Sequence, residues 1–150
     1  MNHNLFEKIL LVVDGAEPSI AAANYAVQLA VQTGGHIIAV FVVDTATMEY
    51  LTRMHIFIAE EREEFERDLQ KTGERYLEYV RTIGRNHKIE IETVQKRGSF
   101  HQTILQEARK LAANVIVMGG WRHSITAKDT TSVERQLVLN ETELPVLVIK

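Results

Sequence analysis

Four short apolar runs constrain the fold of this chain more than any other feature. They are "KILLVVDG" at 8–15, "HIIAVFVVD" at 36–44, "NVIVMGG" at 114–120 and "LPVLVIK" at 144–150. Each is rich in valine and isoleucine and too short for a helix. The first three are typical of buried strands of a parallel sheet, and the fourth predicts a strand that finishes the sequence. A fifth segment, "KIEIETVQKRG" at 88–98, alternates apolar and polar residues and predicts a strand exposed on one side.

Helical patterns lie between these runs. After the first run, Pro18 suits an early helical turn and Gly34-Gly35 suits the end of a helix. From about Ile56 to Ile83 the pattern predicts a long amphipathic helix, whereas residues 45–54 show no clear period and are expected to form a connection. The residues expected to face inward from the first helix are Ile20, Ala23, Val27, Ala30 and Val31.

Two further helices are predicted in the second half of the chain. The first begins with Ser99 as its N-cap, and the second runs from Thr131 or Ser132 to about Asn140. The inward positions expected in the first of them are Ile104, Leu105, Ala108, Leu111 and Ala112.

The alternation of five strands with helices predicts the α/β class. We expect one domain over residues 1–150, built on a single doubly wound, five-stranded, mostly parallel sheet with helices on both faces. A chain of 150 residues suits one compact domain.

Composition excludes several kinds of function. The net charge of −3 gives no general attraction to nucleic acid or anionic membranes, and the chain has no cysteine for disulfides, thiolate catalysis or cysteine-bound zinc. The apolar run Ile9–Val13 is too short for a signal-peptide core or a membrane span. We therefore expect a cytoplasmic protein whose partners include neither nucleic acid nor membrane.

A ligand site is expected where the strands end. In doubly wound sheets ligands bind beyond the carboxyl ends of the strands, which brings "VVDGAEPS", "VVDTATM" and "MGGWRH" together. Asp14 has two readings, which one residue can combine. In the first, its carboxylate hydrogen-bonds a ribose hydroxyl or an adenine amino group; in the second, it caps the next helix or fixes the Asp14-Gly15 turn.

Familiar catalytic and binding motifs are missing from the sequence. It has no G-x-G-x-x-G after the first strand, no G-x-x-x-x-G-K-[ST], no carboxylate cluster of a phospho-acceptor site and no histidine pair at metal-ligand spacing. Trp121, directly after the glycine pair, is expected to pack on the last helix; the alternative is stacking on an adenine or on a partner protein.

The whole chain resembles the universal stress protein family of the adenine nucleotide α-hydrolase-like superfamily. The matching segments, in the family's order, are "KILLVVDGAEPSIAAANYAVQLA", "HIIAVFVVD", "KRGSFHQTILQEARKLAANVIVMGG" and "TSVERQLVLNETELPVLVIK". The resemblance implies the strand order 3-2-1-4-5 and a homodimer in which the last strand, 145–149, pairs with its twin. That strand is apolar, and an uncovered apolar edge strand is an aggregation hazard.

ATP-binding members of the family carry G-x2-G-x9-G-[S/T] after the fourth strand, where the glycines let backbone N–H groups wrap the phosphates. Here Gly119 matches the first glycine, but Arg122 stands at the second and the third falls near Thr131. Ser132 follows Gly119 by thirteen residues where the pattern needs fourteen, so the loop is one residue short. The phosphate half of the site is degenerate.

The nucleoside half of the site looks intact by the same resemblance. Asp14 matches the acidic residue that contacts the nucleoside, and Val42 matches the valine beside the adenine. Ser132 and Val133 match the hydroxyl-then-valine start of the last helix. The resemblance thus implies a nucleotide site made of Asp14, Val42, Met118, Gly119, Arg122, Ser132 and Val133.

We expect a non-catalytic stress-response homodimer with weak or absent ATP binding and no firm cofactor. The alternative is a regulatory switch that binds ATP, with Mg²⁺, or AMP. In that switch the cationic Arg122, His123 and Lys128 replace the missing glycines. The sequence supplies no catalytic residue and no metal cluster, and it leaves slow ATP hydrolysis open. An adenylating enzyme is disfavoured, because "VVDGAEPS" offers no phosphate loop near the first strand.

Overall fold

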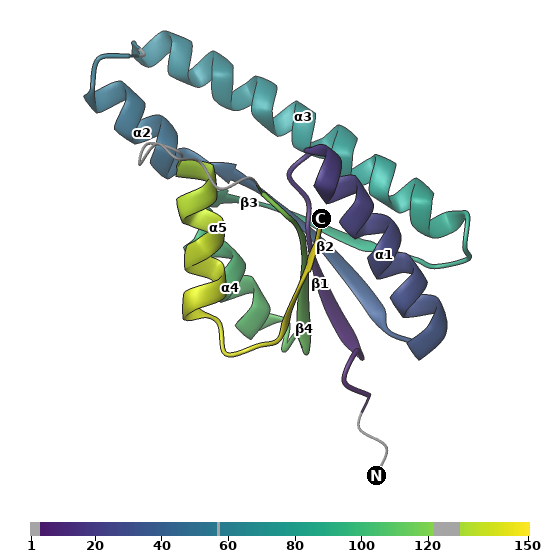
Figure 1. Cartoon of the computed structure of the whole chain (residues 1–150). Helices are drawn as coiled ribbons and strands as arrows, with labels where there is room; N and C mark the ends of the chain where they lie inside the picture. Colours follow the sequence, from purple (N-terminus) through teal and green to yellow (C-terminus); the bar gives the residue numbers. More distant parts are fainter. Residues whose placement is uncertain (1–3, 57, 122–129) are drawn as a thin grey trace.

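The computed structural model describes residues 4–56, 58–121 and 130–150, which form one parallel sheet with helices on both sides (Figure 1). Neighbouring strands follow the order β3-β2-β1-β4-β5, and every pairing is parallel. This confirms the predicted fold class and strand order. The strands are β1 Lys8–Val12, β2 His36–Asp44, β3 Glu92–Gly98, β4 Val115–Gly119 and β5 Val146–Ile149.

The helices cover the sheet in two layers. In Figure 1, α1 and α3 lie over one face, and α4 and α5 lie over the other, which confirms the prediction of helices on both faces. The described helices are α1 Glu17–Thr33, α2 Thr45–Arg53, α3 Ala59–Arg85, α4 Phe100–Lys110 and α5 Thr130–Glu141.

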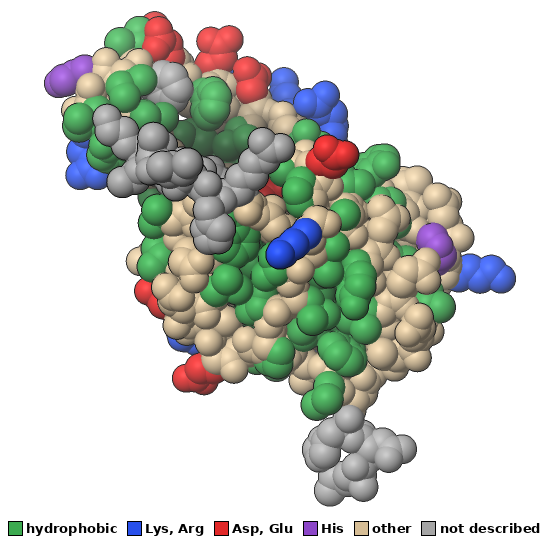
Figure 2. Space-filling model, viewed as in Figure 1, with side chains coloured by type: hydrophobic (Ala, Val, Ile, Leu, Met, Phe, Trp, Pro, Cys, Tyr) green, Lys and Arg blue, Asp and Glu red, His purple; other side chains and the backbone are tan. Residues whose placement is uncertain are grey.

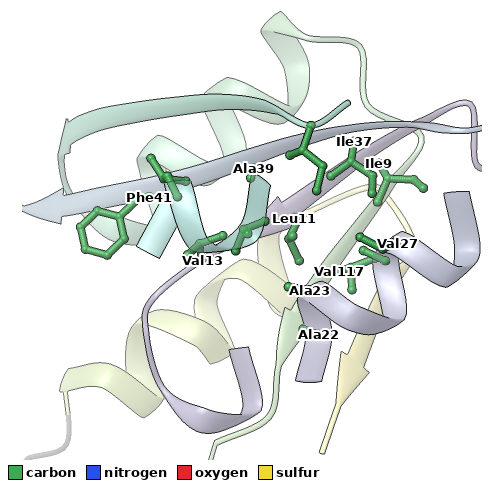
Figure 3. Packing of buried hydrophobic residues seen from close by; sticks show 14 of the residues in the cluster. Ile9, Leu11, Val13, Ala22, Ala23, Val27, Ile37, Ala39, Phe41 and Val117 are labelled. Carbon is green, nitrogen blue, oxygen red and sulfur yellow. The ribbon is translucent and has the colours of Figure 1, made fainter. Parts of the chain in front are cut away.

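Alternation along β1 divides the core into two clusters. Ile9, Leu11 and Val13 point toward α1 and α3 (Figure 3), whereas Leu10 and Val12 pack on the side of α4 and α5. All five are at most 2% exposed. Burying each such side chain stabilises the fold by about 1.5–3 kcal/mol, so these continuous apolar runs favour a sheet covered on both faces.

The buried face of α1 agrees with the prediction at Ala23, Val27 and Ala30, which are at most 1% exposed. It differs elsewhere: Val31 is 50% exposed and Ile20 only half-buried, while Ala22 and Ala26 are fully buried. The helix lies close to the sheet, and a close approach favours alanine over larger side chains at the contact.

The segment expected to be an aperiodic connection is in fact helix α2, and the long helix α3 begins at Ala59 rather than near Ile56. The side chain of Asp44, the last residue of β2, is the cap of α2 and accepts a hydrogen bond from the Thr47 N–H at 3.0 Å. A strand that ends in aspartate thus passes directly into a helix, because the aspartate satisfies an otherwise unpaired N–H group.

Two boundaries in the second half also differ from the prediction. Strand β3 begins at Glu92 rather than Lys88, and Lys88 adopts a positive φ of 61° in the turn before it. Helix α4 ends at Lys110, so Ala112, expected to face inward, is exposed with a φ of 53°.

None of the helices within the described ranges combines the length and apolar character that crossing a bilayer demands.

Candidate functional site

A cavity of about 610 Å³ lies at the carboxyl ends of β1, β2 and β4, beside the point where the strand order reverses. Its size suits a small-molecule ligand. The three stretches expected to meet there do meet. The first contributes Val13, Asp14, Ala16 and Pro18, the second Val42, Asp44, Thr47 and Met48, and the third Gly120 and Trp121.

Other elements complete the cavity, and sequence reasoning did not find them. Phe41 comes from β2, Leu51 from α2, Phe65 and Leu69 from α3, Phe100 from α4, and Glu134 and Arg135 from α5. The apolar members carried a helical or strand period, but the period could not show which core positions lie next to a cavity.

Asp14 is held in a local turn. Its Oδ1 accepts a hydrogen bond from the Ala16 N–H at 3.0 Å, and its own N–H donates to Ser19 Oγ at 3.1 Å. Gly15 follows with a φ of 80°, and a Cβ added there would lie 2.2 Å from a ring carbon of Tyr76. The turn-forming role of Asp14 is therefore confirmed, and its contact with a nucleoside stays a prediction.

The other oxygen of Asp14 forms an ion pair with Arg135 of α5. Arg135 is only 8% exposed, and its guanidinium carbon lies 4.7 Å from the centre of the Phe100 ring. A buried guanidinium over an aromatic ring and beside a carboxylate is a favourable arrangement. No pattern in the sequence indicated it, because an arginine in a polar helical turn is ordinarily assigned to solvent.

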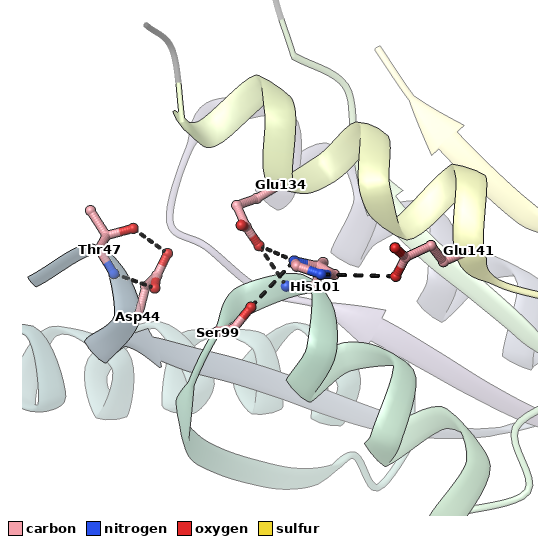
Figure 4. Close-up of polar contacts among 6 residues, drawn as sticks. All are labelled: Asp44, Thr47, Ser99, His101, Glu134 and Glu141. Carbon is pink, nitrogen blue, oxygen red and sulfur yellow. Dashed lines mark hydrogen bonds and ion pairs between the residues drawn. The ribbon is translucent and has the colours of Figure 1, made fainter. Parts of the chain in front are cut away.

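Glu134, the residue before Arg135, connects α5 to the start of α4 (Figure 4). Its Oε2 accepts from the His101 N–H at 2.9 Å and lies 2.6 Å from His101 Nδ1. Ser99 occupies the predicted N-cap position, but its side chain makes no capping bond, so the carboxylate of Glu134 takes that role.

The group formed by Ser99, His101 and Glu134 is not a nucleophilic triad. Ser99 Oγ lies 3.2 Å from Nδ1 of His101, the same ring nitrogen that contacts Glu134. A triad needs the hydroxyl and the acid on opposite ring nitrogens. On the other side of the ring, His101 Nε2 lies 3.8 Å from Glu141 Oε2, so the geometry indicates a connection between α4 and α5 (Figure 4).

The remaining residues of the implied nucleotide site lie in different surroundings. Val42 lines the cavity and is 8% exposed, but Met118 is 1% exposed within the core beneath α4 and α5. Gly119 lies against the first turn of α1, where an added Cβ would come within 2.5 Å of the Pro18 carbonyl carbon. The close contact between strand and helix alone therefore requires glycine at position 119.

Trp121 is half-buried, packs on the cluster that includes Val138 of α5, and lines the cavity. It thus packs against the core on that side of the sheet and still presents a surface to a ligand, while its packing on the last helix in particular stays a prediction. Arg122, His123 and Lys128 lie outside the described residues. Ser132 and Val133 are in the first turns of α5; neither lines the cavity, and Val133 is 52% exposed.

Within the described ranges no group of three or more histidine, aspartate and glutamate side chains is arranged to hold a metal ion.

A doubly wound parallel sheet of five strands, with a cavity at its switch point, places the chain among the small α/β proteins. The sequence matches the family model described as the universal stress protein family over residues 5–150. The chain belongs to the universal stress protein family.

Individual relatives agree with this assignment. The chain is 28% identical over 148 residues to universal stress protein MJ0531 of Methanocaldococcus jannaschii, covering 98% of this chain and 84% of that protein. Among solved structures, hypothetical protein MJ0577 superimposes with a TM-score of 0.76 at 18% identity, covering 97% of this chain and 96% of the other. A universal stress protein from Archaeoglobus fulgidus, solved in complex with dAMP, has a TM-score of 0.67 at 17% identity, covering 97% and 99%. At these identities the two structures show the shared fold.

Proposed function

We propose that this member of the universal stress protein family is a non-catalytic regulatory protein of the cytoplasm with weak or absent ATP binding. It acts in the stress response through protein contacts rather than turnover. The ion pair between Asp14 and Arg135 is the observation that carries the weak-binding part of this proposal. The carboxylate that would contact a nucleoside is already paired within the protein.

Charge in the cavity supports the same conclusion. Its described lining contains the carboxylates of Asp14, Asp44 and Glu134 and one basic side chain, Arg135. A polyphosphate would meet net negative charge from this described part of the lining, and like charges at close range repel strongly where water is excluded. In the sequence, Arg122 stands where ATP-binding members of the family carry a glycine, and arginine disfavours the positive φ that would turn backbone N–H groups toward a phosphate.

The second candidate is a switch that binds ATP with Mg²⁺, or AMP. The structural relative solved with dAMP favours it, since the two proteins share the fold. In this version the side chains of Arg122, His123 and Lys128 replace the missing glycines as anion ligands.

We further propose a homodimer formed through residues 145–149. Strand β5 is the last strand in the sheet order, so one of its edges faces away from β4. A hollow of about 580 Å³ lies beside it, lined by Leu5, Phe6, Pro145 and Leu147 among others, and Leu5 is 72% exposed. Figure 2 shows apolar side chains gathered on the face of the molecule that carries this edge. A second copy pairing with β5 would cover both features.

The decisive experiment is to purify the protein, denature it and assay the supernatant for released nucleotide. The proposal predicts a substoichiometric amount. One ATP or AMP per chain would refute weak binding and favour the nucleotide-binding switch. Incubation with Mg²⁺-ATP tests the non-catalytic claim separately, and turnover above the uncatalysed rate that survives repurification would refute it.

A further inference from the structure

The three carboxylates of the cavity share one property: each already accepts hydrogen bonds from the protein itself. Asp14 accepts from the Ala16 N–H and pairs with Arg135. Asp44 Oδ1 accepts from the Thr47 N–H at 3.0 Å, and its Oδ2 accepts from the Thr47 hydroxyl at 2.8 Å.

The third carboxylate is engaged in the same way. Glu134 accepts from the backbone of His101 and contacts its ring. Among the described residues no buried side-chain nitrogen or oxygen lacks a hydrogen-bond partner. A ligand rich in hydroxyl groups must therefore compete with donors that the fold holds in place.

The rest of the described lining is largely apolar and aromatic. These side chains come from β2, α2, α3, α4 and the residue after Gly120. They are Phe41, Met48, Leu51, Phe65, Phe100 and Trp121. Aromatic and thioether groups favour flat, apolar ligands, because contact removes both surfaces from water without unpaired polar groups.

Arg135 keeps a carboxylate of the cavity, that of Asp14, from being available to a ligand. It is held from two directions, by the carboxylate of Asp14 and by the ring of Phe100. Its neighbour Glu134 fixes the same turn of α5 to the start of α4. Removing Arg135 from Asp14 would require this part of α5 to be rearranged, and it would leave a desolvated carboxylate unpaired.

We propose that the cavity takes an uncharged, planar, largely apolar molecule the size of a nucleobase. Arg135 is the specificity-determining residue that withholds Asp14 from ribose hydroxyls. This inference rests on the proposed function only in using the same cavity. It adds the class of ligand and the residue that selects it.

The first test is a series of four probes titrated into the wild-type protein and followed by NMR chemical shifts of cavity residues. The probes are 9-methyladenine, adenosine, AMP and ATP with Mg²⁺. We expect 9-methyladenine and adenosine to bind within about threefold of each other, and AMP and ATP at least about tenfold more weakly. A preference of tenfold or more for adenosine over 9-methyladenine, tighter binding of either nucleotide, or no binding of 9-methyladenine at millimolar concentration would overturn the inference.

The second test frees Asp14. Arg135→Gln removes the charge, and we expect adenosine to gain at least about tenfold over 9-methyladenine, because Asp14 can then accept from the ribose hydroxyls. Adding Asp14→Asn to Arg135→Gln should abolish the gain. Arg109→Gln makes the same charge change at an exposed position on α4, and it should leave the ratio of affinities unchanged.

A purely structural role for Arg135 would lower stability in Arg135→Gln without changing that ratio, and this result would refute its part in specificity. If Arg135→Gln does not fold, the wild-type probe series decides the ligand class alone. The proposed function has an independent outcome: one nucleotide per purified chain would refute it whatever the probe series shows.

Discussion

Replacing Gly119 by alanine tests whether this glycine is needed for packing or only for a phosphate. An ideal Cβ at position 119 lies 2.5 Å from the Pro18 carbonyl carbon and 2.6 Å from the Ser19 nitrogen. Carbon atoms prefer separations of about 3.5–4.0 Å, so the start of α1 must move by about 1 Å. Both contacts are with backbone, which cannot rotate away as a side chain can.

We therefore expect Gly119→Ala to lie at the upper end of overpacking costs, about 3 kcal/mol in the free energy of unfolding. In a domain of this size that lowers Tm by about 6–12 °C. Gly120→Ala is the matched control, because its nearest neighbours would lie 3.5 Å away and its N–H bond to the Ile149 carbonyl at 2.7 Å is kept. Its stability should change by no more than about 0.5 kcal/mol.

Urea denaturation followed by circular dichroism gives both values without any ligand. Equal stabilities for the two variants would refute the packing explanation. Gly119 would then have to be explained by ligand binding alone.

Further predictions concern α5 and the edge strand. Glu134→Ala removes the acceptor for the His101 N–H and should cost about 1–2 kcal/mol in urea denaturation. Glu141→Ala, whose carboxylate is 49% exposed and 3.8 Å from His101, should change stability by less than about 0.5 kcal/mol; equal costs would contradict the capping role of Glu134. The carbonyl of Pro145, just before β5, accepts a hydrogen bond from the Ile116 N–H, and the carbonyl of Ile149 accepts one from the N–H of Gly120, just after β4. Since alternate residues of a strand face the same neighbour, the backbone of Val148 points to the open edge. Val148→Pro should then leave a folded monomer in sedimentation while Val148→Ala stays dimeric; a dimer in the proline variant would refute pairing through β5.

The sheet could be predicted from the sequence because a buried strand requires a continuous run of apolar residues. Continuous runs such as Ile9–Val13 and Ile37–Val43 are long enough for strands only, and the helices between them set the parallel direction. Turn chemistry was also readable at Asp14-Gly15. Periodicity could not predict how closely each helix approaches the sheet. Ala22 and Ala26 of α1 are buried because the helix lies close to the sheet, a distance that no local pattern records.

The site was predictable in position but not in chemistry. Strand ends had to meet at one edge, and they do, around Asp14, Val42 and Gly120. The partner of Asp14 could not be found, because Arg135 is 121 residues away and lies in a helix of mixed polar sequence. Helix α2 could have been predicted from Asp44. An aspartate that ends a strand can accept a hydrogen bond from the N–H three residues later and so cap a helix, even where no helical period follows.

The central claim is that the protein binds ATP weakly or not at all. A thermal-shift titration of the wild-type protein with Mg²⁺-ATP, after any co-purified nucleotide has been removed, tests it most directly. A ligand present at 100 times its Kd stabilises a protein by about 2.7 kcal/mol. In a domain of this size that raises Tm by about 5–10 °C. Weak or absent binding predicts that Tm stays within about 1 °C at 1 mM ATP, where site occupancy would remain low. A rise of 5 °C or more at that concentration, corresponding to a Kd of about 10 µM, would contradict the claim.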